Sequence, residues 1–345
     1  MKMVFNSNWL ILLAILIILL GGCATHKVMA PALQRFYYVE LHMGSLFRIV
    51  MYAPDRKTAD KAAEAAFRRI IELDNIMSDY YTNSELVKLC KIKAGTPVKV
   101  SNELFDVISK SLEISKMTDG AFDITIGPCV KLWRLARTKR ELPSVDEVNK
   151  AKSLVDYKKI RLSRYTRSIT LSTNGMILDL GGIGKGYSAD QALKLLRSMG
   201  ITRALVAASG DIAMGDPPPG EKGWLIGVES IDQQENGIKR YLKLSNCGIS
   251  TSGDTEQYVI IGGKRYSHIV DPKTCLGLTN RIGVTVIAPD ATTSDSLATA
   301  LCSAGLAKAT DIVKRFHNVS AFIVTIENER TNVIKTAGFP EFILE

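Results

Sequence analysis

Cysteine and histidine are scarce in this sequence of 345 residues, and those present form no familiar metal or redox motif. There are four histidines and six cysteines, and no two cysteines form a CxxC pair, which argues against a zinc ribbon or a dithiol redox site. Apart from Cys23 the cysteines are odd in number and widely spaced: Cys90, Cys129, Cys247, Cys275 and Cys302. We expect most of them to be small buried side chains. Whether any two form a disulfide stays open.

Motifs of several common protein classes are also missing. The sequence has no GxSxG elbow of a serine hydrolase, no Walker A loop and no internal repeat. The net charge is +9, but lysine and arginine are scattered, without the basic blocks and interleaved aromatic residues of nucleic-acid binders. We therefore expect no nucleic-acid partner. With 46% hydrophobic and 23% charged residues, the composition is that of a globular protein.

The N-terminal segment has the pattern of a signal peptide that ends in a lipidation site. Lys2 precedes an apolar run from Trp9 to Leu20, and Gly21-Gly22-Cys23 follows. This run of twelve residues is shorter than the roughly 20 that a membrane-spanning helix needs. A cleaved signal is therefore favoured, and an uncleaved membrane helix is the alternative.

Three segments follow from this pattern. We predict a signal peptide over residues 1–22, a lipidated tether over 23–32 and a single domain over 33–345. Acyl chains on Cys23 would anchor the protein stably to a membrane. The expected location is the bacterial cell envelope, on a membrane surface that faces the periplasm or the exterior.

The periodicity of apolar residues predicts an α+β fold with mostly antiparallel sheets. Phe36–His42 and Ser45–Tyr52 have the composition of two strands joined at Met43-Gly44. Between Asp55 and Met77, apolar residues recur every three or four positions, which predicts a helix with one buried face. Further strands are expected at 168–172, 203–207, 224–228, 258–261, 283–287 and 321–326, and further helices at about 102–120 and at 187–199, 294–304 and 307–316.

A glycine-rich segment, Asp179-Leu180-Gly181-Gly182-Ile183-Gly184-Lys185-Gly186-Tyr187, follows a strand-like run and opens a predicted helix. Backbone N–H groups and the helix dipole at such a point attract phosphate, and glycine lets a ligand approach closely. Taken alone, the segment also fits an ordinary tight turn between a strand and a helix.

His268 and Asp271 lie in the turn-prone segment Ser267–Thr274. A histidine there can accept a proton near neutral pH, although a lone histidine is more often structural than catalytic.

A cluster of oxygen-bearing side chains, Thr292, Thr293, Ser294, Asp295 and Thr299, is expected at the start of a helix. Asp295 and Thr299 are four residues apart and therefore lie on one helix face. Such a sparse set suits Mg²⁺, which takes carboxylates, carbonyls, waters and substrate phosphates as ligands. The alternative is that these residues only cap the helix.

Taken together, these segments resemble the ApbE family, the FAD:protein FMN transferases, in order from Met43 nearly to the C-terminus. Four further stretches carry the resemblance: Met77-Ser78-Asp79-Tyr80 with Ser84-Glu85-Leu86, Thr118–Thr125 leading to Trp133, Thr251-Ser252-Gly253-Asp254, and Thr299-Ala300. The resemblance implies an α+β architecture of the T-fold type. Departures include Cys275, where the family usually has glycine.

The resemblance implies an enzyme that splits the pyrophosphate of FAD and transfers FMN to a threonine or serine hydroxyl of a target protein, with release of AMP. FAD is then a substrate, Mg²⁺ the cofactor, and the partner an acceptor protein, expected to be a membrane redox subunit. A Mg²⁺-dependent FAD pyrophosphatase and a non-catalytic FAD-binding lipoprotein are the alternatives.

The resemblance also assigns residues. It places FAD against Met43, Tyr80, Ala121, Phe122, Asp123, Asp179, Lys185, His268 and Ile269, and Mg²⁺ on the Gly182 carbonyl, Asp295 and Thr299. The expected catalytic residues are His268, which would deprotonate the acceptor hydroxyl, and Asp295. Tyr80 or Phe122 would stack on a ring of the nucleotide.

Overall fold

The structure is a computed structural model that describes residues 32–228, 240–253, 257–327 and 330–344. The chain divides into Met1–Leu33 and Gln34–Glu345, and the fold described below is that of the second unit. The predicted signal peptide, Cys23 and the tether up to residue 31 lie outside the described residues, so these boundaries stay predictions. Among the described helices, none is long and apolar enough to cross a membrane.

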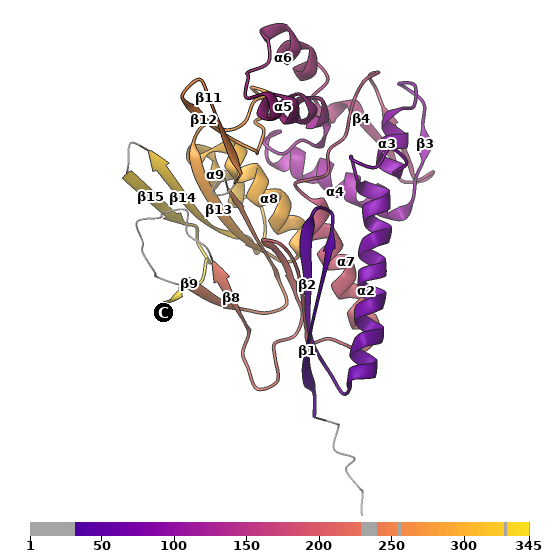
Figure 1. Cartoon of the computed structure of the whole chain (residues 1–345), viewed down its shortest axis with the longest axis vertical. Coiled ribbons are helices and arrows are strands. Elements are labelled where there is room, and N and C mark those ends of the chain that lie inside the picture. Colours follow the sequence, from indigo (N-terminus) through magenta and orange to yellow (C-terminus); the bar gives the residue numbers. More distant parts are fainter. Residues whose placement is uncertain (1–31, 229–239, 254–256, 328–329, 345) are drawn as a thin grey trace, which may run out of the picture. The chain divides into compact units, whose positions relative to one another are not determined.

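An antiparallel sheet of eight strands forms the centre of this unit (Figure 1). The strands, in sheet order, are β1 (Gln34–His42), β2 (Ser45–Ala53), β6 (Ala204–Ala208), β7 (Asp211–Met214), β10 (Gly248–Gly253), β13 (Arg281–Ala288), β14 (Ser320–Glu327) and β15 (Arg330–Lys335). The predicted hairpin is its first pair: His42 pairs with Ser45, and Met43 and Gly44 form the turn with φ angles of 51° and 67°. The predicted α+β class is confirmed.

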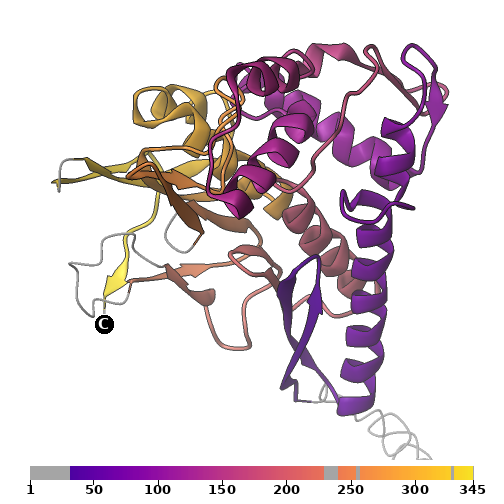
Figure 2. The ribbon, with the colours of Figure 1, turned by 45° about the horizontal axis from the view of Figure 1, so that its top comes forward.

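Helices α2 (Arg56–Met77), α7 (Gly184–Ser198), α8 (Ala291–Ala304) and α9 (Leu306–Val313) cover one face of this sheet (Figures 1 and 2). The Asp55 side chain caps α2 by accepting the Thr58 N–H at 2.7 Å. The helix buries alanines, including Ala59, Ala62 and Ala66, against β1, β2 and α7. The predicted amphipathic helix is therefore confirmed, and its small side chains keep it close to the sheet.

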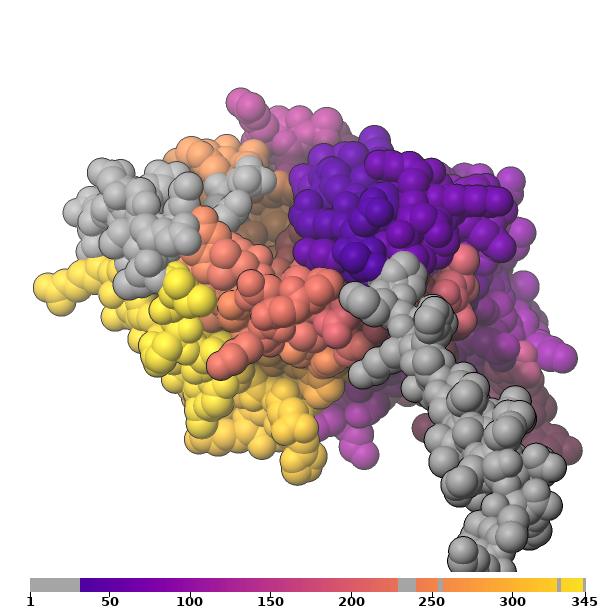
Figure 3. All heavy atoms as spheres, turned by 90° about the horizontal axis from the view of Figure 1, so that it is seen from below, coloured from indigo at the N-terminus to yellow at the C-terminus, as the bar shows by residue number. Residues whose placement is uncertain are grey.

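The opposite face of the sheet is partly covered by three short strands, in the order β16 (Ile343–Leu344), β9 (Arg240–Leu244) and β8 (Trp224–Val228). Trp224, Ile226 and Leu242 pack there against Leu205 of β6 and Phe322 of β14. Figure 3 shows this side of the molecule, with the salmon-coloured segments between the indigo N-terminal hairpin and the yellow C-terminal strands. The C-terminal strand β16 thus pairs with β9, which lies about 100 residues earlier in the sequence.

The segment between β2 and β6 adds a helical layer and a small sheet. The helices are α3 (Glu85–Cys90), α4 (Asn102–Met117), α5 (Gly127–Lys139) and α6 (Val145–Lys152), with 3-10 turns η1 (Ile124–Ile126) and η2 (Tyr157–Lys159). The small sheet has the order β3 (Val98–Lys99), β5 (Ser168–Leu171), β4 (Ile160–Ser163). Later in the chain, after β10, a separate hairpin is formed by β11 (Tyr258–Ile261) and β12 (Lys264–Ser267). Sequence patterns did not predict α5, which opens with Gly127-Pro128. Proline is compatible with that position because the first helical N–H groups need no partner within the helix.

Candidate active site

A cleft with a volume of about 990 Å³ opens where the predicted segments converge. Its walls come from the β1–β2 turn, the end of α2, the glycine-rich segment before α7, the Ser209-Gly210 turn, β8, β10, the His268 segment and α8. Residues from Met43 to Thr299 therefore meet at one site. The antiparallel sheet brings them together, because its strand ends and turns lie at a common edge.

Lys185 lies in the first turn of α7, because this helix begins at Gly184, three residues earlier than predicted. The Lys185 ammonium forms an ion pair with Asp211 of β7, which is buried. Burial alone would lower the pKa of Lys185, but the carboxylates of Asp211 and Asp295 outweigh it and raise the pKa. Lys185 therefore stays charged in the cleft wall.

The three residues predicted to hold a cation lie close together, and two of them line the cleft. Asp295 and Thr299 line the cleft from one face of α8. Gly182 adjoins them: a β-carbon built on it would lie 3.1 Å from the Thr299 hydroxyl oxygen. Helix α8 begins at Ala291, earlier than predicted, and its cap is Asp290, whose side chain accepts the Thr293 N–H. The cluster therefore lies in the first turns of the helix, as expected, with Thr299 about one turn further along, whereas the alternative that these residues only cap the helix is wrong, because the cap is Asp290.

Asp295 is only 2% exposed, and its carboxylate accepts the Gly186 N–H at 3.0 Å. Burial and the nearby Asp211 carboxylate raise the pKa of Asp295 to about 7, against the opposing effect of Lys185. Among the described residues there is no group of three or more His, Cys, Asp or Glu side chains that could hold a metal. One carboxylate, one hydroxyl and one carbonyl instead fit Mg²⁺, which completes its shell with water and substrate phosphate.

Helices α7 and α8 touch at Gly186, which explains the glycine there. A β-carbon on Gly186 would lie 2.2 Å from the Ala291 carbonyl oxygen and 2.8 Å from the Asp295 β-carbon. Only glycine permits this approach, which places the α7 N-terminus against Asp295. The N-cap residue Ile183 makes no side-chain cap, and the Asp295 carboxylate accepts the Gly186 N–H in the first turn, so one carboxylate already lies at the N-terminus of α7.

His268 and Ile269 line the opposite wall. The carbonyl of Gln257 accepts from the His268 backbone N–H at 2.9 Å and lies 3.2 Å from Nδ1. Because a carbonyl only accepts, Nδ1 carries the hydrogen and Nε2 is the basic nitrogen of this tautomer. The indole Nε1 of Trp133 in α5 donates to the Ser267 carbonyl at 2.9 Å. Helix α5 therefore supports the segment that carries His268.

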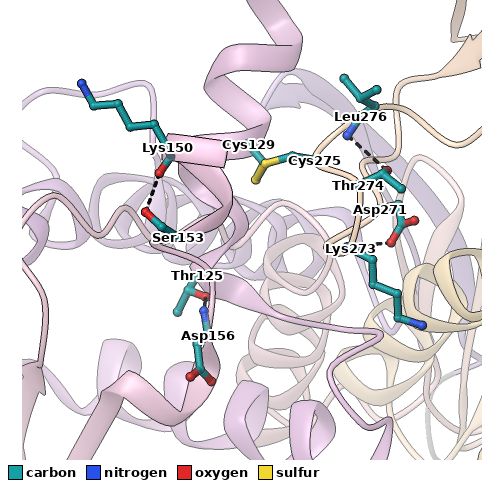
Figure 4. The surroundings of a disulfide bond; sticks show 10 residues. All are labelled: Thr125, Cys129, Lys150, Ser153, Asp156, Asp271, Lys273, Thr274, Cys275 and Leu276. Carbon is teal, nitrogen blue, oxygen red and sulfur yellow. Dashed lines mark hydrogen bonds between the residues drawn. A yellow bond between two sulfur atoms is a disulfide. The ribbon is translucent and has the colours of Figure 1, made fainter. Parts of the chain in front are cut away.

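A disulfide between Cys129 of α5 and Cys275 holds the far end of the same segment (Figure 4). Both cysteines are fully buried. Cys275 has a φ angle of 60°, a left-handed conformation that favours glycine, so its cross-link gives a physical reason for cysteine at this position. The question that the sequence left open is thus answered for this pair, while Cys90, Cys247 and Cys302 form no disulfide within the described part of the chain.

The remaining predicted FAD residues fall into two groups. Met43 and Tyr80 line the cleft, whereas Ala121, Phe122 and Asp123 lie outside its lining, where the Phe122 ring adjoins Gly182. The Asp123 carboxylate accepts the N–H and hydroxyl of Thr125 and the N–H of Tyr157, and its pKa is raised by burial. It thus joins η1 to η2, and a binding role for these three residues stays a prediction.

Asp179 lies outside the cleft lining and forms an acidic pair with Asp79, which lines the cleft; both side chains are largely buried, at 10% and 14% exposed. Its carboxylate accepts the Gly181 N–H at 2.8 Å, and its pKa is raised by burial and by the charge of Asp79. Arg134 of α5 contacts both carboxylates, at 2.5 Å for Asp79 and 3.4 Å for Asp179. Arg134 was not predicted, because an isolated arginine in an unrecognised helix carries no sequence signal.

Comparisons with known proteins bear on this site. A sequence profile of the ApbE family matches residues 43–323. The chain is 28% identical over 307 residues to the FAD:protein FMN transferase of Escherichia coli K12, covering 88% of this chain and 87% of that protein. It is 29% identical over 302 residues to the protein of the same name from Vibrio cholerae, covering 86% and 88%.

Solved structures agree with these sequence matches. The flavin transferase ApbE of Vibrio cholerae superimposes with a TM-score of 0.81 at 24% identity, covering 89% of this chain and 98% of that chain. The ApbE protein of Thermotoga maritima gives a TM-score of 0.77 at 29% identity, covering 88% and 97%.

Proposed function

This chain belongs to the ApbE family, and on that premise we propose that it is an FAD:protein FMN transferase that uses Mg²⁺. The proposed reaction transfers FMN from FAD to a threonine or serine hydroxyl of an acceptor protein and releases AMP. One observation carries the proposal: a single cleft brings together the N-terminus of α7 with Lys185, oxygen donors of the kind that bind Mg²⁺, and His268. A pyrophosphate, its counter-charges and a base therefore fit into one site.

Two elements of the cleft suit the pyrophosphate of FAD. The N-terminus of α7 and the Lys185 ammonium would neutralise its negative charge. Asp295, Thr299 and the Gly182 carbonyl would hold Mg²⁺, which supplies further charge neutralisation on phosphate oxygens. Because Asp211 keeps Lys185 charged and in place, its charge is organised before the substrate binds.

His268 is proposed to take the proton of the acceptor hydroxyl at Nε2. The hydroxyl oxygen then attacks the phosphorus of the FMN half, the bond from this phosphorus to the bridging oxygen breaks, and AMP departs with that oxygen. The Gln257 carbonyl and the Trp133–Ser267 hydrogen bond would orient the imidazole for this step.

The test is to incubate the soluble chain from residue 24 onward with FAD, Mg²⁺ and a flavin-accepting protein domain. A mass gain of one FMN on the acceptor that disappears with EDTA is expected. Free FMN and AMP without an adduct would favour the pyrophosphatase alternative, and unchanged FAD would favour the carrier alternative.

We also propose that the protein is exported and acylated at Cys23, and that its acceptor is a membrane redox subunit. The apolar run before Cys23 supports export. The Cys129–Cys275 disulfide supports it independently, because disulfides persist mainly in oxidising compartments outside the cytoplasm.

A further inference from the structure

Arg134 lines the cleft but has no part in the chemistry proposed above. It lies in the middle of α5, and its side chain is 35% exposed. Its guanidinium bonds to Asp79 after the end of α2 and to Asp179 before the glycine-rich segment. One side chain therefore ties three separate segments of the cleft wall together.

The same guanidinium lies over the ring of Tyr80, with Cζ 4.4 Å from the ring centroid. Tyr80 is 72% exposed and borders the cleft. Arginine can stack on an aromatic ring and bind two carboxylates at once because its guanidinium is planar, with five fixed donors. One face of the ring is thus covered by a cation, while the residue itself is largely open to solvent at the cleft.

Arg134 also acts on the glycine-rich segment through Asp179. Burial and the charge of Asp79 raise the pKa of Asp179, and the charge of Arg134 counteracts them. Asp179 in turn accepts the Gly181 N–H, next to the proposed cation ligand Gly182. Loss of Arg134 would leave two neighbouring carboxylates without their shared counter-charge.

We propose that Arg134 is a positioning residue that holds Tyr80 as a platform on which a flat ring of the flavin nucleotide stacks. The proposal rests on the proposed function, since it names a binding element of the same cleft. The isoalloxazine and the adenine of FAD share the required chemistry, a planar aromatic face that stacks on a tyrosine ring.

The first test measures equilibrium binding of FAD in the presence of EDTA, which prevents turnover. Binding is measured by the quenching of flavin fluorescence and by calorimetry. Arg134→Ala should bind FAD roughly fivefold to tenfold more weakly and quench less, the effect of losing one stacking contact. Arg134→Lys keeps the charge and should recover only part of this loss. Arg137→Ala, three residues further along α5 and outside the cleft lining, is the matched control and should bind as wild type.

A double-mutant cycle with Tyr80→Leu tests whether Arg134 acts through Tyr80. The effect of Arg134→Ala should shrink in the Tyr80→Leu background, and additive effects would overturn the proposal. Thermal unfolding checks that each variant is folded, and Arg134→Lys carries the test should Arg134→Ala not fold.

Separate titrations with FMN and AMP identify the stacked ring. Weaker binding of either one by Arg134→Ala supports the proposal, whereas unchanged binding of both overturns it. If the wild-type protein binds FAD and the Arg134→Ala variant binds it equally well, only this inference is contradicted. A wild-type protein that neither binds FAD nor transfers FMN contradicts the proposed function instead.

Discussion

At the residue scale, Asp295 combines deep burial with a place in the cleft lining, which it shares with Lys185 and Thr299. Asp295→Asn keeps the shape and an acceptor for the Gly186 N–H but removes the charge that would hold Mg²⁺. We expect transfer to fall by about a hundredfold, the usual cost of one electrostatic stabiliser in an active site.

The free energy of unfolding of Asp295→Asn should stay equal or rise, because the variant no longer buries a charge. Steady-state transfer assays and urea unfolding measure the two effects. Asp311→Asn, an exposed residue of α9 paired with Lys314, is the control that should change neither. Transfer at a near-normal rate in Asp295→Asn would exclude the cation-binding role.

Asp190 makes a pH-dependent contribution to stability. This residue of α7 accepts the N–H groups of Ala291 and Thr292 and the Thr292 hydroxyl, and burial raises its pKa to about 6. The folded state therefore binds a proton more tightly than the unfolded state. This difference in proton binding adds to the free energy of unfolding, fully below about pH 4, and the added stability is lost as the pH rises through 6. Its size is about 1.4 kcal/mol for each unit by which the folded-state pKa exceeds the unfolded-state pKa.

Asp190→Asn should abolish this dependence. The variant loses hydrogen-bond acceptors and should be less stable than wild type at pH 4.5, but the difference should narrow towards pH 7. Urea unfolding at several pH values measures it, and a gap that stays constant between pH 4.5 and 7 would refute the assignment.

At the scale of elements, α5 supports the His268 segment through one hydrogen bond and one disulfide. Cys129 and Cys275 are 146 residues apart, so their link restricts the unfolded chain strongly. The double variant Cys129→Ala with Cys275→Gly removes the link and places glycine where φ is positive. Loss of the disulfide should lower the free energy of unfolding by about 2–4 kcal/mol. Glycine at position 275 should offset up to roughly 1 kcal/mol of this loss, because it adopts the positive φ angle without strain.

Reductant separates this effect from simple side-chain loss. Wild type should lose stability in dithiothreitol, whereas the double variant should not respond. Equal responses of the two proteins would mean that the disulfide does not contribute. Transfer below the unfolding transition should change little, because Trp133 still holds the Ser267 carbonyl.

At the scale of the whole molecule, the proposed lipid anchor makes a direct prediction. Full-length protein expressed in a bacterial host should incorporate labelled fatty acid and partition into detergent, and Cys23→Ser should do neither while retaining transfer by the extracted protein. An intact mass that still includes residues 1–22, without acylation, would favour the uncleaved membrane helix.

Local sequence patterns were enough for the elements that depend on near neighbours. The β1–β2 hairpin and the amphipathic α2 both follow from residues a few positions apart. The same reason explains why the sequence revealed the glycine-rich segment, the His268 segment and the pair Asp295 and Thr299. Their order along the chain indicated the family.

The pairings that complete the site came only from the tertiary structure. Asp211 meets Lys185, Arg134 meets Tyr80 and Asp179, and Cys129 meets Cys275 across separations of 26 to 146 residues. The path of the chain through an eight-stranded sheet sets such contacts, and no local periodicity encodes them. The hydrogen bonds of the Asp123 carboxylate to the N–H groups of Thr125 and Tyr157 also came only from the tertiary structure, since they join two separate 3-10 turns, while the FAD contact of Asp123 stays a prediction.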